Sequence, residues 1–229
     1  MKLVLFDIDG TLLWTDGAGR RSMEGALIEV FGTSGDSGYR YDGKTDRQIA
    51  REQARHAGFD DAHIDARMAD VLNAYLVRLT SELERDSEAA RMCIGVAPLL
   101  DALEAHDRAT LGLLTGNVAD GARRKLAAVG IDANRFRVNA FGSDHEHRPE
   151  LPGIAKARAL ELMGLDLTGD GIVVIGDTPA DIHCGRSLGV RAIGVATGRY
   201  SVEELQSHDA AAVFTDFSDT AAVVHAILN

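Results

Sequence analysis

The sequence predicts an α/β fold: a doubly wound parallel sheet that carries an inserted, all-helical cap domain. Short, continuous apolar runs recur along the chain, and a stretch of helical periodicity follows each of them. Continuous rather than alternating hydrophobicity is typical of strands buried on both faces, as in parallel sheets. The alternation stops between about residues 16 and 90, where only helical stretches occur. That gap predicts the insertion.

The apolar runs are the predicted strands. They are Leu3–Phe6, Thr110–Leu114, Ile172–Ile175, Arg191–Val195 and a weaker run at Val213–Phe214. Apolar residues at helical spacing predict helices between them, one carrying Val96, Leu99, Leu100 and Leu103 and another Ala122, Leu126 and Val129. Gly130 and Gly189 stand where such helices should end, because glycine readily adopts the left-handed conformation found there.

The insertion shows two apolar stripes at helical spacing, one between Met23 and Phe31 and a longer one between Met68 and Leu79. A glycine- and serine-rich segment separates them, and Gly17 and Gly19 at the start of the insertion are candidate hinge residues. The predicted domains are a core of residues 1–15 and 91–229 and a helical cap of residues 16–90.

Charge and composition narrow the function. The chain has 24 Lys and Arg against 35 Asp and Glu, a formal net charge of −11. Such a surface repels nucleic acid and anionic lipid, so neither is an expected partner. No apolar run approaches the roughly 20 residues that span a bilayer, and Asp7 interrupts the apolar start too early for a signal peptide. Cys93 and Cys184 form no metal-binding motif. We expect a cytoplasmic protein with reduced thiols; its oligomeric state is not predicted.

Polar residues follow three of the predicted strands. The segments are Asp7-Ile8-Asp9-Gly10-Thr11, Thr115-Gly116-Asn117 and Gly176-Asp177-Thr178-Pro179-Ala180-Asp181. Each segment alone is typical of an ordinary turn or helix cap. Together they indicate one site, because ligands of open parallel sheets bind at the carboxyl ends of the strands.

The residue types in these segments indicate phosphoryl chemistry. Asp7 and Asp9 leave an extended backbone on the same side. With Asp177 and Asp181 they place up to four carboxylates in one pocket, which requires a cation, and oxygen ligands favour Mg²⁺. A carboxylate is a nucleophile without prior deprotonation and would form an aspartyl phosphate. A second Asp can protonate the leaving oxygen and later activate water.

These motifs resemble the haloacid dehalogenase (HAD) superfamily, specifically its phosphoglycolate-phosphatase-like branch with a helical cap inserted after the first motif. The first motif, DxDGT, matches Asp7 to Thr11; the second matches at Thr115; the fourth, GDxxxD, matches Gly176 to Asp181. The run from Gly189 to Gly198 also looks like this branch.

The resemblance implies a role for each matched residue. Asp7 would be the nucleophile and a metal ligand, and Asp9 the general acid and base, with its carbonyl on the metal. Thr115 would bind the phosphoryl group, and Thr11, Gly116 and Asn117 would contribute to substrate binding. Asp177 would ligate Mg²⁺, and Asp181 would do so directly or from behind another ligand. Dehalogenases and phosphonatases lack an Asp at the position of Asp9, so Asp9 favours phosphate transfer.

The third motif departs from the family pattern. The family places a Lys just before the helix that precedes the GD strand, whereas this chain has Arg148 four residues before Pro152. Arg148 is the preferred candidate for the catalytic cation, and Lys156, a turn inside the helix, is the rival. His145 and His147 are interpreted as solvated loop residues.

In the cap, Gly43 to Arg47 resembles the substrate-specificity loop of this branch. Lys44 or Arg47 would then reach over the pocket to hold the distal part of the substrate. The equally supported alternative is a solvated helix start, capped by Thr45 or Asp46.

The sequence therefore predicts an Mg²⁺-dependent phosphatase that hydrolyses a small phosphate monoester, phosphoglycolate-like or a sugar phosphate, through an aspartyl phosphate. A phosphomutase of the same superfamily is the first alternative, because the first motif does not separate the two. A receiver-like signalling module needs neither a lid nor Asp9, and a catalytically silent binding protein needs no acid pair, so both are disfavoured.

Overall fold

The computed structural model describes residues 1–86 and 88–229, in which six strands form one parallel sheet. The strand order is β5-β4-β1-β6-β7-β8. The strands are β1 (Lys2–Phe6), β4 (Ala109–Thr115), β5 (Val138–Phe141), β6 (Ile172–Gly176), β7 (Arg191–Val195) and β8 (Ala212–Phe214). From central β1 the chain builds outward to one edge and then to the other, so the predicted doubly wound α/β fold is confirmed.

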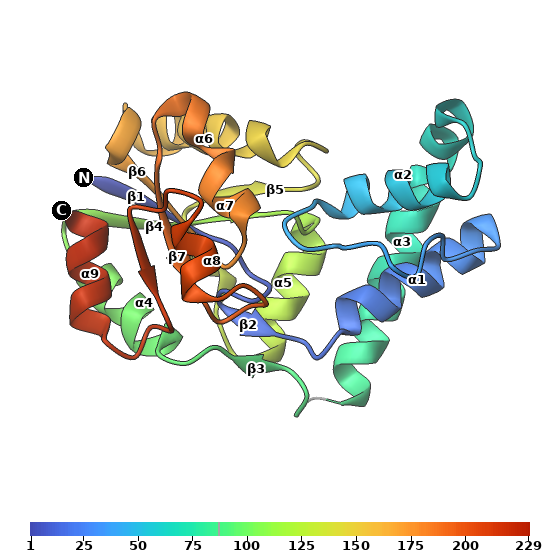
Figure 1. Ribbon diagram of the computed structural model, residues 1–229, viewed down its shortest axis with the longest axis horizontal. Coiled ribbons are helices and arrows are strands. Elements are labelled where there is room, and N and C mark those ends of the chain that lie inside the picture. The colour runs from blue at the N-terminus through green and yellow to red at the C-terminus, as the bar shows by residue number, and fades with distance from the viewer. Residues whose placement is uncertain (87) are drawn as a thin grey trace.

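Helices cover both faces of the sheet (Figure 1). One face packs against α4 (Val96–Glu104), α5 (Ala119–Ala128) and α9 (Thr220–Leu228), and the other against α6 (Leu151–Met163) and α7 (Pro179–Cys184). The short α8 (Val202–Gln206) lies against β7 and β8. Val4 and Phe6 of β1 point into the first core and Leu3 and Leu5 into the second. This two-sided burial explains why the strand is apolar without alternation.

A group of helices lies to one side of the sheet, at the right of Figure 1. It consists of α1 (Ala18–Phe31), α2 (Asp46–His56) and α3 (Asp61–Arg85), which share a separate apolar core. Two short antiparallel strands, β2 (Leu13–Trp14) and β3 (Arg91–Met92), pair at its base. The regular elements described between residues 16 and 90 are thus all helices, as expected, and this segment is called the helical insertion below.

β5 and α2 are among the elements that the sequence patterns did not predict. β5 contains the polar residue Asn139, which interrupts its apolar run. The side-chain oxygen of Asn139 accepts a hydrogen bond from the Leu113 N–H at 3.0 Å. α2 is rich in charged residues and has only a narrow apolar stripe; the Thr45 side chain caps it by accepting a hydrogen bond from the Gln48 N–H at 3.1 Å. Short 3₁₀ turns occur at Ala133–Arg135, Arg148–Glu150, Gly169–Gly171 and Arg186–Leu188.

Two further expectations concern the chain as a whole. Among the described residues, no helix combines the length and the apolar character needed to cross a membrane. Cys93 and Cys184 are both buried and free, in agreement with the expected reduced thiols.

Candidate active site

Three carboxylates converge at the carboxyl edge of the sheet. Asp7 follows β1, Asp177 follows β6, and Asp181 lies in the first turn of α7. All three are buried, and one oxygen of each lies within 4.8 Å of the others. Because β1 and β6 are parallel neighbours, the loops that follow them end at the same place.

The Asp177 carboxylate lies close to two glycines, Gly10 and Gly198, from two different loops. Gly10 has a φ of +83°, a conformation that side chains disfavour, and a Cβ there or at Gly198 would overlap the Asp177 carboxylate. The Thr11 hydroxyl donates a hydrogen bond to Asp177 Oδ1 at 3.2 Å. Thr11 thus holds Asp177 and is absent from the described residues that line the cavity, while its role in substrate binding stays a prediction.

Arg148 occupies the centre of the carboxylate cluster. Its Nη2 lies 3.0 Å from Asp7 Oδ1, also pairs with Asp181, and donates to the Leu114 carbonyl at 3.3 Å. Its side chain is only 5% exposed. Lys156 lies further along α6, half-buried, and among the described residues it does not line the cavity. The geometry thus favours Arg148 over Lys156 for the cationic position.

Asp181 pairs with Arg148 and is itself held by Thr178. Its Oδ2 accepts hydrogen bonds from the Thr178 N–H at 3.0 Å and the Thr178 hydroxyl at 2.7 Å, in a capping box at the start of α7. Its other oxygen pairs with Arg148. The carboxylate is thereby held by the protein on both oxygens.

The carboxylates of the cluster outnumber the positive charges beside them. Burial raises the pKa of Asp7 to about 6; Arg148 opposes this rise, while Asp181 and Asp9 add to it. Burial, Asp181 and Asp7 together raise the pKa of Asp177 well above its usual value. One guanidinium does not balance these carboxylates, so the cluster favours an additional cation.

The donor set fits Mg²⁺. Asp7 and Asp177 present carboxylate oxygens at the wall of the cavity, and Mg²⁺ typically takes one or two carboxylates and keeps waters or a substrate phosphate as its other ligands. The oxygen-only chemistry of the cluster suits this ion better than zinc or copper.

The second loop supplies neutral polar groups. Thr115 ends β4, and its Oγ1 accepts a hydrogen bond from Asn117 Nδ2 at 2.8 Å. The same Nδ2 donates to Asp9 Oδ2 at 2.7 Å. Thr115, Gly116 and Asn117 all line the cavity, as does Asp9. The loops after β1 and β4 are thus joined by side-chain hydrogen bonds.

Lys125 is a site residue that the sequence analysis missed. From α5, its Nζ lies 2.8 and 2.7 Å from the two oxygens of Asp9 and 2.7 Å from Asn117 Oδ1. Its side chain is 5% exposed. The sequence did contain a signal for it. Lys125 stands one turn after Ala122 on the apolar face of the helix, and a lysine in such a buried place needs a charged or polar partner.

A cavity of about 570 Å³ lies between the carboxylate cluster and the helical insertion. Lys44 lines it, but its Nζ is directed to Glu52 Oε2 at 2.8 Å and to the Tyr39 hydroxyl at 2.6 Å. Arg47 is missing from the described residues that line it. The expected reach of either cation over the pocket is therefore not seen in this arrangement.

The insertion is fastened to the core beside the cavity. The Asp46 N–H donates to the Gly116 carbonyl at 2.8 Å, and the Val118 N–H donates to Asp46 Oδ2 at 2.8 Å. The Thr45 hydroxyl donates to the Glu146 carbonyl at 2.6 Å. A Cβ at Gly116 would overlap the Lys44 carbonyl, so the close approach requires glycine there. The start of α2 is thus a docking element as well as a capped helix start.

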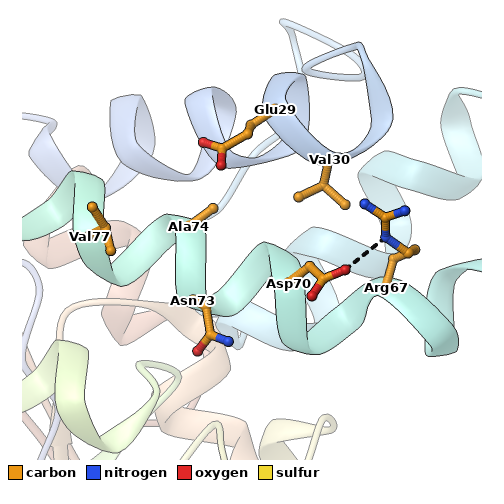
Figure 2. Close-up of a pocket in the computed structure, with 7 residues that line it drawn as sticks. All are labelled: Glu29, Val30, Arg67, Asp70, Asn73, Ala74 and Val77. Carbon is orange, nitrogen blue, oxygen red and sulfur yellow. Dashed lines mark ion pairs between the residues drawn. The ribbon is translucent and has the colours of Figure 1, made fainter.

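A second cavity, of about 440 Å³, lies on the insertion between α1 and α3 (Figure 2). Its one ion pair among the residues drawn joins Arg67 Nε to Asp70 Oδ2 at 2.9 Å. The lining residues are Glu29, Val30, Arg67, Asp70, Asn73, Ala74 and Val77. This mixture lacks the buried, converging carboxylates of the first cavity, which remains the candidate active site.

Fold and site together define an α/β enzyme whose chemistry is centred on carboxylates beside a helical insertion. The chain matches the family of haloacid dehalogenase-like hydrolases over residues 4–186, and a family of HAD-hydrolase-like proteins over residues 153–220. It belongs to the haloacid dehalogenase-like hydrolases. The resemblance seen in the motifs is thereby confirmed.

Individual relatives agree with this assignment. A phosphoglycolate phosphatase of Rhodospirillum rubrum is 27% identical over an alignment that covers 95% of this chain and 88% of that protein. The crystal structure of a hydrolase from Pseudomonas syringae superposes with a TM-score of 0.73 at 21% identity, covering both chains fully. A predicted phosphoglycolate phosphatase from Haemophilus somnus gives a TM-score of 0.68 at 19% identity and covers 98% of each chain. The two structures are similar in fold.

Proposed function

We propose that this hydrolase is an Mg²⁺-dependent phosphatase that cleaves a small phosphate monoester, phosphoglycolate-like or a sugar phosphate, through an aspartyl phosphate on Asp7. The observation that carries the proposal is the position of Asp7. It is buried at the wall of the cavity, paired with Arg148 and adjacent to Asp177, while Asp9 faces the same space. The Rhodospirillum rubrum relative supports the substrate class.

The proposed reaction has two steps at phosphorus. The Asp7 carboxylate attacks, an O–P bond forms, and the ester O–P bond breaks. Asp9 gives its proton to the departing oxygen. A water molecule then attacks phosphorus and loses a proton to Asp9, inorganic phosphate leaves, and the Asp7 carboxylate is restored. Arg148 and Thr115 would bind phosphoryl oxygens; the proposal is supported by their position at the wall of the cavity that Asp7 also lines.

The metal would be held by Asp7 and Asp177, with the Asp9 carbonyl and Asp181 as further candidates. When bound, Mg²⁺ supplies positive charge that offsets the carboxylates and the substrate phosphate. Residues 16–90 would act as a cap that excludes water during the first transfer, and residues 1–15 and 91–229 would form the catalytic core.

Asp7→Asn tests the nucleophile. The amide keeps the shape of the side chain but is not a nucleophile, so turnover of any phosphate ester should fall by several orders of magnitude while the fold is retained. The measurement is inorganic phosphate release over a panel of small phosphate esters, with circular dichroism as the control for folding. Activity within about tenfold of the wild type would rule out the aspartyl-phosphate route. Transfer of the phosphoryl group to a sugar hydroxyl, without phosphate release, would identify a mutase.

A further inference from the structure

Among the described residues at the cavity wall, the strongly buried cations are Lys125 and Arg148. The proposed mechanism gives a role to Arg148 but none to Lys125. It comes from α5, outside the three motif loops, yet its ammonium contacts both oxygens of Asp9 and the side chain of Asn117. Its side chain is 5% exposed. A lysine buried to this extent requires partners, and here the partners are groups of the site.

In this arrangement the ammonium of Lys125 has no donor left for a substrate. A lysine ammonium has three protons to donate. Two contacts go to the Asp9 oxygens, at 2.8 and 2.7 Å, and the third goes to Asn117 Oδ1 at 2.7 Å. All three donors are therefore used within the protein.

Asp9 is correspondingly held from one side and open on the other. Its Oδ2 accepts from both Lys125 and Asn117 Nδ2, and its Oδ1 accepts from Lys125. The side chain of Asp9 is 39% exposed, and it lines the cavity. The carboxylate is thus fixed on the α5 side, and its exposed part faces the cavity.

The helical insertion completes this arrangement. A Cβ at Gly19 of α1 would lie 3.2 Å from Lys125 Nζ, so the insertion packs directly against the ammonium. Asp46 of α2 accepts a hydrogen bond from the Val118 N–H, immediately before α5. One contact is thus made to α5 itself and the other to the residue that precedes it. The position of Asp9 therefore depends on α5 and on the docked insertion, not only on its own loop.

We infer that Lys125 is a positioning residue for Asp9: it orients the carboxylate that moves protons in both steps, without touching the substrate. This inference rests on the proposed function, because it assigns Asp9 the general acid and base role. A group that sets the direction of a proton donor is valuable, since a misplacement of about 1 Å can cost on the order of 10²-fold in rate.

The test compares Lys125→Met, Asp9→Asn and the double variant. We expect Lys125→Met to lower kcat by about 10- to 100-fold with KM nearly unchanged, because the ammonium makes no substrate contact. Asp9→Asn should cost roughly 10²–10⁴-fold. The double variant should be no slower than Asp9→Asn, within about twofold, because a residue that acts only through Asp9 has nothing further to lose.

The leaving group provides a second readout, which a merely structural role would not move. An alkyl phosphate needs protonation of its leaving oxygen, and nitrophenyl phosphate does not. Lys125→Met should reproduce the preference of Asp9→Asn, with a larger loss in kcat/KM for the alkyl ester. Arg123→Met is the matched control: it removes a cation from the same helix, but that side chain is 61% exposed, and its rates should equal the wild type.

Each outcome decides the inference. Multiplying losses in the double variant, or equal losses for both esters, would show general damage and overturn it. If Lys125→Met fails to fold, Lys125→Gln keeps a polar group in the buried position and carries the same comparison. Wild-type protein that releases no phosphate from any ester overturns the proposed function and this inference together. An active wild type with additive variants overturns the inference alone.

Discussion

The guanidinium of Arg148 bridges Asp7, which follows β1, and Asp181, which lies in the first turn of α7. We propose that it takes the cationic position for which the motif resemblance implied a lysine. Nη2 alone makes both ion pairs, and the planar guanidinium carries further N–H groups that an ammonium lacks. One side chain can therefore hold the nucleophile and its supporting carboxylate in a fixed relation.

Removing this side chain should be costly for turnover. Arg148→Ala is expected to lower kcat/KM by about 10²-fold or more, because a fixed cation beside the phosphoryl oxygens is lost. Arg148→Lys should recover part of the loss, since it restores charge without the fork. Steady-state kinetics with a phosphate ester measure both effects, and thermal melts check that the unpaired carboxylates have not unfolded the variant.

Lys156→Ala is the comparison for Arg148. Its side chain is half-buried and is not found at the cavity wall in the described part of the chain, so the loss should be under about fivefold. The opposite ranking, with Lys156→Ala inactive and Arg148→Ala nearly normal, would show that the cationic position has been assigned to the wrong residue.

At the level of single residues, sequence spacing predicted what lies in the motif loops. Asp7, Asp9 and Asp177 follow apolar runs directly, and parallel pairing of the strands carries those loops to one edge. Lys125 lies eight residues beyond Asn117, inside a helix, and only the turn geometry of α5 brings it back to Asp9. Thr11 illustrates the converse, because its hydroxyl faces Asp177 although its motif suggested substrate.

Among the elements, α2 has a double role that follows from its first residue. Asp46 is buried, and its carboxylate accepts the Val118 N–H while its own N–H donates to Gly116. Burial raises the pKa of Asp46 to about 6, while the charge of Lys125 and the Val118 N–H act in the opposite direction. The junction between the insertion and the core therefore contains a carboxyl that resists ionisation.

The stability of the protein should consequently depend on this carboxyl. The folded state holds the proton more tightly than the unfolded chain, so its stabilisation is complete below the ordinary pKa of 3.8 and is lost as the pH rises through about 6. The difference corresponds to at most about 3 kcal/mol. Asp46→Asn does not titrate and still offers an oxygen to Val118. The melting temperature of the variant should thus rise relative to the wild type between pH 4 and pH 7.

Melting curves of both proteins across this range provide the measurement. A variant that is less stable than the wild type by a constant amount at every pH would show that the carboxylate form of Asp46, rather than its proton, stabilises the junction.

The elements also differ in how well sequence alone predicted them. β1, β4, β6 and β7 are buried on both faces, and that burial appears directly as continuous hydrophobicity. β5 lies at an edge and contains a polar residue, so the pattern is interrupted. α2 buries positions at helical spacing, but Ile49 is the only large apolar residue among them, and hydrogen bonds to the core help to hold the helix in place, so its apolar signal is weak.

At the scale of the whole molecule, the distribution of charge is the dominant feature. The chain has a formal net charge of −11, yet its candidate site must accept an anionic ester. Asp7, Asp177 and Asp181 add negative charge at the point of attack, and Arg148 neutralises only part of it. Burial of this surplus destabilises the metal-free protein, so a cation that binds the cluster should stabilise the folded state as a whole.

Mg²⁺ should therefore raise the melting temperature independently of any substrate. At 100 times its dissociation constant a ligand adds about 2.7 kcal/mol, which for a chain of this length corresponds to about 5–10 °C. Asp177→Asn removes one ligand and one buried charge. This variant should melt no lower than the wild type without metal and should show little further rise when Mg²⁺ is added.

Thermal melts of both proteins, with Mg²⁺ and with excess chelator, measure this difference, and phosphate release from the same samples follows activity. Chelation should abolish turnover by the wild type and added Mg²⁺ should restore it, whereas Ca²⁺ should restore little, because calcium prefers more ligands and longer bonds. Equal shifts for the wild type and Asp177→Asn would place the stabilising ion elsewhere. Full activity in chelator would mean that Arg148 alone offsets the carboxylates and that the reaction needs no metal ion.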